Sequence, residues 1–145
     1  MLMKVLLDTN VVLDAIANRE PFYLDAQKII NSILDNKLEG YITANSITDI
    51  YYVSRKYLIK TDLLTTMRSL FAIFSIIDVL GTDCHKALDF PLDDYEDALI
   101  AVCGNKADIN YIITRDKEFL DKTKSKFTIS VISPADFLRN RQLID

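Results

Sequence analysis

Four aspartates, widely separated along the chain, could together form a chemical site: Asp8, Asp49, Asp97 and Asp116. The sequence around each of them predicts a position where a strand ends or a helix begins. Carboxylates that converge from such distant points repel one another unless a divalent cation lies between them. We therefore expect a site for a hard metal ion, and cleavage of a phosphodiester bond is the leading hypothesis for its chemistry.

The elements that must position these side chains alternate between strand and helix patterns. Residues 4–7 form an apolar run that predicts a buried strand, with a helix over about 9–17 behind it. Gly40 predicts the stop between a helix over about 24–36 and a strand at 41–43. Further along, we expect helices over about 61–72, 83–88, 98–103 and 134–139, an apolar run at 74–79, and strands at 111–113 and 129–132.

Strands and helices in this order predict a three-layer α/β/α sandwich around a central, mostly parallel sheet. Such sheets place their sites beyond the carboxyl ends of the strands, where Asp8 and Asp116 are expected. Asp49 is expected in the first turn of a helix that Asn45 or Ser46 caps. Acids in first turns are also common for stability alone, so a structural role stays open for Asp49 and Asp97 taken singly.

Composition limits the classes of protein to which the chain can belong. Its 145 residues are 50% hydrophobic and 26% charged, which predicts one globular domain spanning residues 1–145. The four aspartates account for the whole formal net charge of -4. An acidic balance normally speaks against a nucleic-acid partner, but this objection weakens if the acidity is confined to one pocket that binds metal.

Other chemistries find little support in the residue types. His85 is the only histidine, and the isolated Cys84 and Cys103 form no C-x-x-C pair, so a thiolate zinc site and a disulfide framework are not expected. A phospho-acceptor receiver domain would need a lysine after the last strand, where the chain has Ser133–Pro134. No stretch reaches the length of a membrane span, and the predicted compartment is the cytoplasm.

Four short segments, one around each aspartate, resemble acidic motifs of a known family in the same order. They are Leu6–Val11, Ser46–Tyr52, Tyr95–Ala101 and Ile113–Asp116, the last followed by Phe119. The family is that of the PIN-domain ribonucleases, in particular the VapC-type toxins of bacterial toxin–antitoxin pairs. Asp49 departs from its pattern, which more often has Glu there, and Asp93, Asp94 and Glu96 are additional acids beside Asp97.

The resemblance implies a PIN-like fold and a metal-dependent endoribonuclease, in which Asp8, Asp49, Asp97 and Asp116 bind Mg²⁺ or Mn²⁺ and are catalytic. Asp94 is expected to be either a helix cap or a further ligand. The partners implied are an RNA substrate, a small cognate antitoxin of a type II toxin–antitoxin system, and a second copy of the chain. A catalytically degenerate PIN-type module that binds RNA or protein is the alternative, suggested by the Asp at position 49.

Four other residues have predicted supporting roles near these acids. Asn10 and Thr114 are expected either to hydrogen-bond the metal ligands or to be ordinary helix-cap and strand-end residues. Arg115 and Lys56 are the predicted RNA contacts. The sequence leaves open the RNA target and the number of metal ions.

Overall fold

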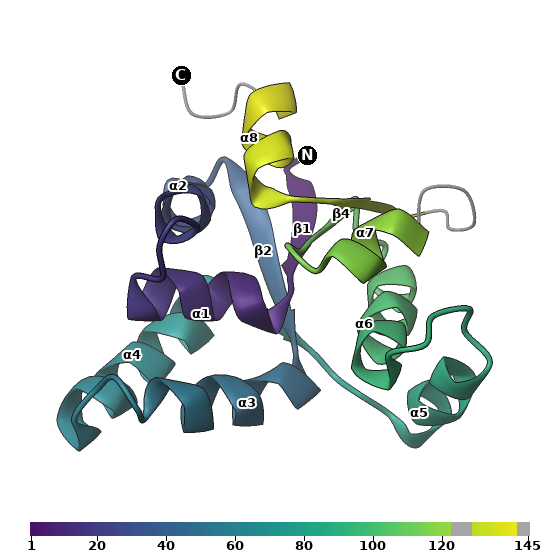
Figure 1. Cartoon of the computed structure of the whole chain (residues 1–145), viewed down its shortest axis with the longest axis horizontal. Coiled ribbons are helices and arrows are strands. Elements are labelled where there is room, and N and C mark those ends of the chain that lie inside the picture. The colour runs from purple at the N-terminus through teal and green to yellow at the C-terminus, as the bar shows by residue number, and fades with distance from the viewer. Residues whose placement is uncertain (123–128, 142–145) are drawn as a thin grey trace.

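The computed structural model describes residues 1–122 and 129–141. Figure 1 shows how strands and helices alternate along this part of the chain. The elements are β1 (Met3–Leu7), α1 (Thr9–Ala17), α2 (Tyr23–Leu34), β2 (Leu38–Thr43), α3 (Ala44–Ser54), α4 (Lys60–Ile73), β3 (Ser75–Ile77), α5 (Gly81–Leu88), α6 (Tyr95–Lys106), β4 (Tyr111–Ile113), α7 (Lys117–Lys122), β5 (Ser130–Ile132) and α8 (Pro134–Arg141).

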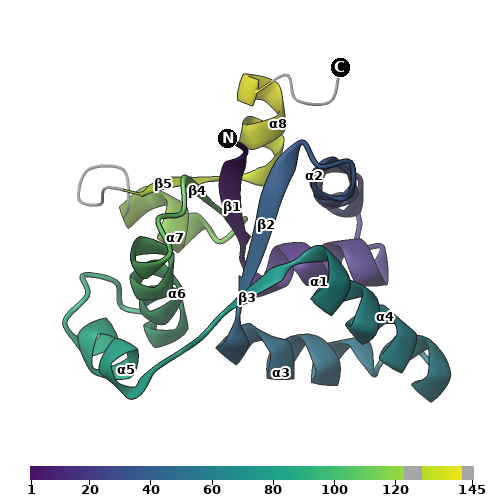
Figure 2. The same ribbon diagram turned by 180° about the vertical axis from the view of Figure 1, so that it is seen from behind.

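The five strands form one parallel sheet in the order β3-β2-β1-β4-β5. The chain adds β2 and β3 on one side of β1 and then returns to add β4 and β5 on the other, as Figure 2 shows from behind. The direction of strand addition therefore reverses between β1 and β4. In open parallel sheets this reversal leaves a crevice beyond the carboxyl ends of the two strands, and ligands bind there.

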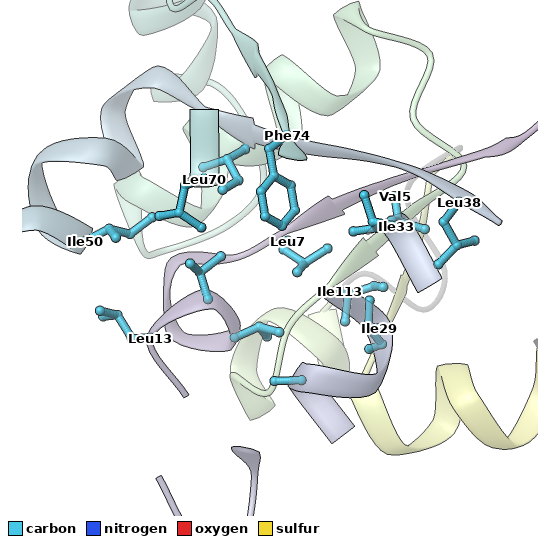
Figure 3. Packing of buried hydrophobic residues seen from close by; sticks show 14 of the residues in the cluster. Val5, Leu7, Leu13, Ile29, Ile33, Leu38, Ile50, Leu70, Phe74 and Ile113 are labelled. Atoms are coloured by element: carbon cyan, nitrogen blue, oxygen red, sulfur yellow. The ribbon is translucent and has the colours of Figure 1, made fainter. Parts of the chain in front are cut away.

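The apolar run of β1 is buried because both faces of the sheet are covered. Val5 and Leu7 belong to one hydrophobic cluster, which also contains residues of α1, α2, α3, α4 and α8. Leu6 points to the opposite face and packs with residues of α5, α6 and α7. Figure 1 shows the two groups of helices on either side of the sheet, and Figure 3 shows the first cluster around Val5 and Leu7. The predicted three-layer sandwich is confirmed.

Gly40 has a different role from the predicted stop before a strand. It lies inside β2, which begins at Leu38. A Cβ atom at this position would lie 2.6 Å from Cδ1 of Ile33 and 3.0 Å from Cδ1 of Phe74. The absence of a side chain therefore lets α2 and the end of α4 pack closely on the sheet.

Gly40→Ala is expected to lower the free energy of unfolding by about 1–3 kcal/mol, because overpacking forces neighbouring side chains out of place. Urea unfolding measures the change. Gly81→Ala is the matched control, since a Cβ at Gly81 would have no atom within 4 Å, and it should leave stability nearly unchanged. Equal effects of the two substitutions would contradict this account.

Two local predictions about α3 differ from the structure, and one short helix has no counterpart among the predicted elements. Helix α3 begins at Ala44 with Thr43 as its N-cap, so the predicted caps Asn45 and Ser46 are wrong and Asp49 lies beyond the first turn. The reason is that β2 leads directly into α3, with no loop to hold a separate cap. The helix without a predicted counterpart is the short α7.

Within residues 1–122 and 129–141, no helix is both long and apolar enough to span a membrane.

Candidate active site

A cleft of about 250 Å³ lies beyond the carboxyl ends of the central strands, and carboxylates dominate its wall. The structure brings all four predicted aspartates together there, and it adds two further acids from the start of α6. The lining residues are Asp8, Thr9, Asn10, Leu13, Asp49, Val53, Asp94, Glu96, Asp97 and Asp116. Residues far apart in the sequence thus meet where the strand order reverses, which is the place that the fold offers for a ligand.

Asp8 follows β1 and is the N-cap of α1. Its Oδ1 accepts a hydrogen bond from the Thr9 N–H at 2.8 Å, and its Oδ2 accepts one from the Thr114 hydroxyl at 2.7 Å. The side chain is nearly fully buried, and burial raises the pKa of Asp8 above its ordinary value although both hydrogen bonds oppose this. A buried carboxylate held from two sides in this way has a fixed position at the bottom of the cleft.

Asp97 lies in the first turn of α6, and only 7% of its surface is exposed. Burial, followed by the charges of Asp8, Asp94, Asp116 and Glu96, raises the pKa of Asp97 to about 8. Without a cation, this carboxyl therefore holds a proton at neutral pH. A divalent ion in the cleft would offset the negative charges of the neighbouring acids and would so favour release of that proton.

Asp94 is the N-cap of α6 and also lies on the cleft wall. Its Oδ1 accepts a hydrogen bond from the Asp97 N–H at 3.0 Å. The two roles considered for Asp94 therefore do not exclude one another: it caps the helix, and it adds a carboxylate to the cleft beside Asp97.

Asp116 follows β4 and begins the turn into α7. Its Oδ1 accepts hydrogen bonds from the N–H groups of Glu118, at 2.9 Å, and Phe119, at 3.3 Å. The Asp116 N–H donates to the hydroxyl of Thr114, which itself donates to Asp8. Thr114 thus connects the acids that follow β1 and β4, the two strands between which the sheet order reverses.

Of the remaining predicted residues, two line the cleft and two do not. Asn10 is exposed on the cleft wall, and Asp49 reaches the cleft from α3 with an exposed side chain. Lys56 is exposed beyond the end of α3. Neither Lys56 nor Arg115 is among the described residues that line the cleft, and their contacts with RNA stay predictions.

Arg115 instead makes a paired contact with a residue that the sequence analysis did not single out. Its Nε and Nη2 donate to the two carboxylate oxygens of Asp14 at 2.7 and 3.1 Å. The guanidinium carbon also lies 4.3 Å from the centre of the Phe22 ring. Asp14 is 1% exposed, and the sequence signal that could have revealed it is an acid within the buried stretch of α1. The contact fixes the loop that carries Thr114 and Asp116 against α1.

The residues of the cleft fit a hydrated divalent cation. Among the described residues, no three His, Cys, Asp or Glu side chains lie close enough, as they stand, to hold one ion in common. Mg²⁺ commonly takes one or two carboxylates and keeps several of its waters, so a spread set of acids suits it. The Thr9 hydroxyl is buried and has no hydrogen-bond partner within the described chain, and Thr9 is one of the residues that line the cleft. A hydroxyl of this kind can bind one of the waters of such an ion.

Solved structures with the same fold cover nearly the whole chain. The VapBC2 complex from Rickettsia felis, bound to a DNA fragment from its promoter, has a chain with a TM-score of 0.65 and 16% identity, covering 90% of this chain and 98% of that one. DNA-bound VapBC from Salmonella typhimurium gives a TM-score of 0.66 with 15% identity, covering 92% of this chain and 99% of that one. At these identities the likeness concerns the fold alone.

Sequence comparison relates the chain to a named family. A protein named Ribonuclease VapC1, from Aquifex aeolicus (strain VF5), is 29% identical over 121 residues, which cover 80% of this chain and 83% of the relative. The sequence profile of the PIN domain matches residues 4–118, which include all six acids of the cleft. Since that match covers well over half of its length, the chain belongs to the PIN domain family.

Proposed function

We propose that this protein is a metal-dependent endoribonuclease and the toxin of a type II toxin–antitoxin pair. The observation that carries the proposal is the acidic cleft, in which Asp8, Asp49, Asp97 and Asp116 meet at the carboxyl ends of β1 and β4. The relative from Aquifex aeolicus is named a ribonuclease, and the structural neighbours include toxin–antitoxin complexes. Both support this function for a PIN domain whose cleft contains an acid from each of the four motifs.

The residues of the cleft have separate tasks in this proposal. Asp8 and Asp97 bind Mg²⁺ or Mn²⁺, with Asp49 and Asp116 holding it directly or through water. When bound, the ion supplies an activated water as the nucleophile and neutralises charge that grows on the phosphate. Thr114 keeps the Asp8 carboxylate in place through its 2.7 Å hydrogen bond. Asp94 fixes the backbone of Asp97 by capping α6.

The products follow from the residue types at hand. Metal-free cleavage through the RNA 2′-hydroxyl uses a general acid and a general base, commonly histidines, near neutral pH. The chain has only His85, which is exposed on α5 and does not line the cleft. We therefore expect attack by water, with a 5′-phosphate and a 3′-hydroxyl as products.

A protein partner is part of the same proposal, because a toxin must be kept inactive in the cytoplasm by its antitoxin. The structure has an apolar groove of about 400 Å³ between α3 and α4, lined by Ile47, Thr48, Tyr51, Tyr52, Leu64, Met67 and Phe71. Tyr52 and Phe71 are half exposed. Exposed aromatic side chains beside such a groove suit an apolar partner segment, either from an antitoxin or from a second copy of the chain.

The second candidate is a PIN-type module that binds RNA or protein without cleaving it. Asp49 favours this alternative, because its side chain is one methylene shorter than the Glu that the family more often has. Turnover distinguishes the two candidates, since only the endoribonuclease cleaves RNA at a rate that depends on the metal.

The experiment is incubation of the purified protein with structured and unstructured RNAs in Mn²⁺ or Mg²⁺, with and without a chelator. Cleavage should require the metal and be lost in Asp8→Asn, while Asp35→Asn, at an exposed helix end outside the cleft, should cleave like the wild type. Cleavage that persists in chelator or in Asp8→Asn would overturn the proposal. Metal-dependent RNA binding without any cleavage would favour the binding module.

A further inference from the structure

Asp14 is a buried acid that the proposed chemistry of the cleft does not use. It lies within α1 with 1% of its surface exposed, and it is not among the residues that line the cleft. A buried carboxylate is costly unless a cation and hydrogen bonds compensate for the lost water. Its partners therefore indicate the role of this side chain.

The main partner of Asp14 is Arg115, which belongs to the segment between β4 and α7. Two N–H groups of the guanidinium donate to the two carboxylate oxygens, at 2.7 and 3.1 Å. The guanidinium also lies over the Phe22 ring. A paired contact of this kind fixes the orientation of both planar groups as well as their distance. Arg115 therefore has a defined place against α1, although 29% of its side chain is exposed.

The residues on either side of Arg115 make contacts within the cleft. The Thr114 hydroxyl donates to Asp8 at 2.7 Å, and the Asp116 N–H donates to the Thr114 hydroxyl at 3.0 Å. This segment is therefore attached to α1 at two points, the N-cap Asp8 and Asp14, which lies six residues further along. Six residues of helix span about 9 Å. A segment held by one hydrogen bond can turn about it, whereas two anchors this far apart define how the Asp116 side chain faces the cleft.

We propose that Asp14 is a positioning residue of the active site, which acts through Arg115 on the segment between β4 and α7. This inference rests on the proposed function, because the carboxylates that the segment positions are among those assigned to the metal ion. It also gives Arg115 a role that needs no contact with RNA. Loss of the Asp14 charge should release the segment from α1 and let the Asp116 carboxylate move relative to Asp8.

The first test is amide hydrogen exchange of the metal-free protein, so its readout does not depend on cleavage. Asp14→Asn keeps the shape of the side chain but removes its charge, and the amides of Asp116, Glu118 and Phe119 should exchange about tenfold faster or more. Amides of β1 are the internal reference, because they should stay protected unless the whole protein is destabilised. Arg115→Gln should give the same pattern, and it keeps the test decisive even if Asn at the buried position prevents folding.

Arg19→Gln is the matched control. Arg19 Nη1 lies 3.7 Å from the same carboxylate, but Arg19 belongs to the connection between α1 and α2. Its substitution removes a positive charge beside Asp14 without changing the contact to the segment after β4. Exchange at 116–119 should therefore stay as in the wild type.

Cleavage kinetics provide the second test. In Mn²⁺, Asp14→Asn should lower kcat by roughly 10–10²-fold, since a displacement of about 1 Å in a reacting geometry has effects of this size. The KM for RNA should change little. If Arg115 were instead an RNA contact, Asp14→Asn would free its guanidinium and lower KM, whereas Arg115→Gln would raise KM. Asp14→Asn added to Asp116→Asn should cost little further activity, because both changes affect the same carboxylate.

The outcomes separate this inference from the proposed function. Exchange at 116–119 that is unchanged in Arg115→Gln would overturn the positioning role, whether or not the protein cleaves RNA. Faster exchange without a fall in kcat would overturn it too, because the reaction would then not need the segment to be held in place. A wild-type protein that cleaves no RNA in Mn²⁺ would count against the endoribonuclease, while the exchange of these amides would still decide whether Asp14 holds the segment.

Discussion

Asp97→Asn is expected to reduce RNA cleavage by at least about 10²–10³-fold while making the metal-free protein more stable at alkaline pH. Asn has nearly the shape of Asp but cannot take a negative charge. The substitution therefore removes a metal ligand and also removes a carboxylate that burial and four neighbouring acids disfavour in its charged form. At about pH 8.5 the gain in the free energy of unfolding should be about 2 kcal/mol or more.

The two halves of this prediction are measured on the same preparation. Cleavage rates in Mn²⁺ give the loss of activity, and urea unfolding in chelator gives the gain in stability. Asp35→Asn again serves as the control, because it makes the same chemical change at an exposed position and should alter neither quantity. A stable Asp97→Asn protein that cleaves RNA at the wild-type rate would exclude Asp97 from the catalytic set. An Asp97→Asn protein that is less stable than the wild type in chelator would show that repulsion among the carboxylates does not dominate the effect of Asp97 on stability.

The metal-free wild-type protein is expected to lose stability as the pH rises from about 5 toward 8, and Mn²⁺ should abolish most of that loss. Asp97 has a pKa of about 8 in the folded protein and an ordinary value of 3.8. Between these values the folded state binds a proton that the unfolded state has released, so the free energy of unfolding falls with rising pH. Burial raises the pKa of Asp8 and of Glu96 as well, and both act in the same direction.

Asp83 makes stability depend on pH in the opposite direction, but only at a pH below this range. Its hydrogen bonds with Lys106 and with the Leu80 N–H lower its pKa below the ordinary value of 3.8, so its contribution to stability is lost only in stronger acid. The net change between about pH 5.5 and pH 8 should therefore be a loss of up to about 3 kcal/mol in chelator.

Urea unfolding at several pH values, in chelator and in excess Mn²⁺, measures this dependence. The slope should be shallower in Asp97→Asn, which lacks one of the carboxyl groups whose raised pKa produces it. A wild-type stability that rises with pH over this range in chelator would contradict the description of the cleft, as would a slope that Mn²⁺ leaves unchanged.

Much of the scaffold could be predicted because its signals are local. The apolar run before Asp8 predicts a strand that is buried on both faces, and Val5, Leu6 and Leu7 do alternate between two hydrophobic clusters. The turn into α7 could not be predicted in the same way. Its helix has six residues and begins right after Asp116, which is too short for a helical period to show.

The contacts that complete the cleft depend on how distant elements are placed. The bond from Thr114 to Asp8 joins residues 106 positions apart, and the bonds from Arg115 to Asp14 join residues 101 positions apart. The sequence predicts that Thr114 could hydrogen-bond a metal ligand, but which carboxylate it contacts, and the pairing of Arg115 with Asp14, depend on β4 lying next to β1.

The central claim is that the acidic cleft binds a divalent cation, and calorimetric titration of the chelator-treated protein with Mn²⁺ tests it most directly, without knowledge of the RNA target. We expect saturable binding by the wild type and its loss in Asp8→Asn, whose carboxylate is held at the bottom of the cleft by Thr9 and Thr114. Absence of saturable binding in the wild type, or equal binding in Asp8→Asn, would contradict the claim.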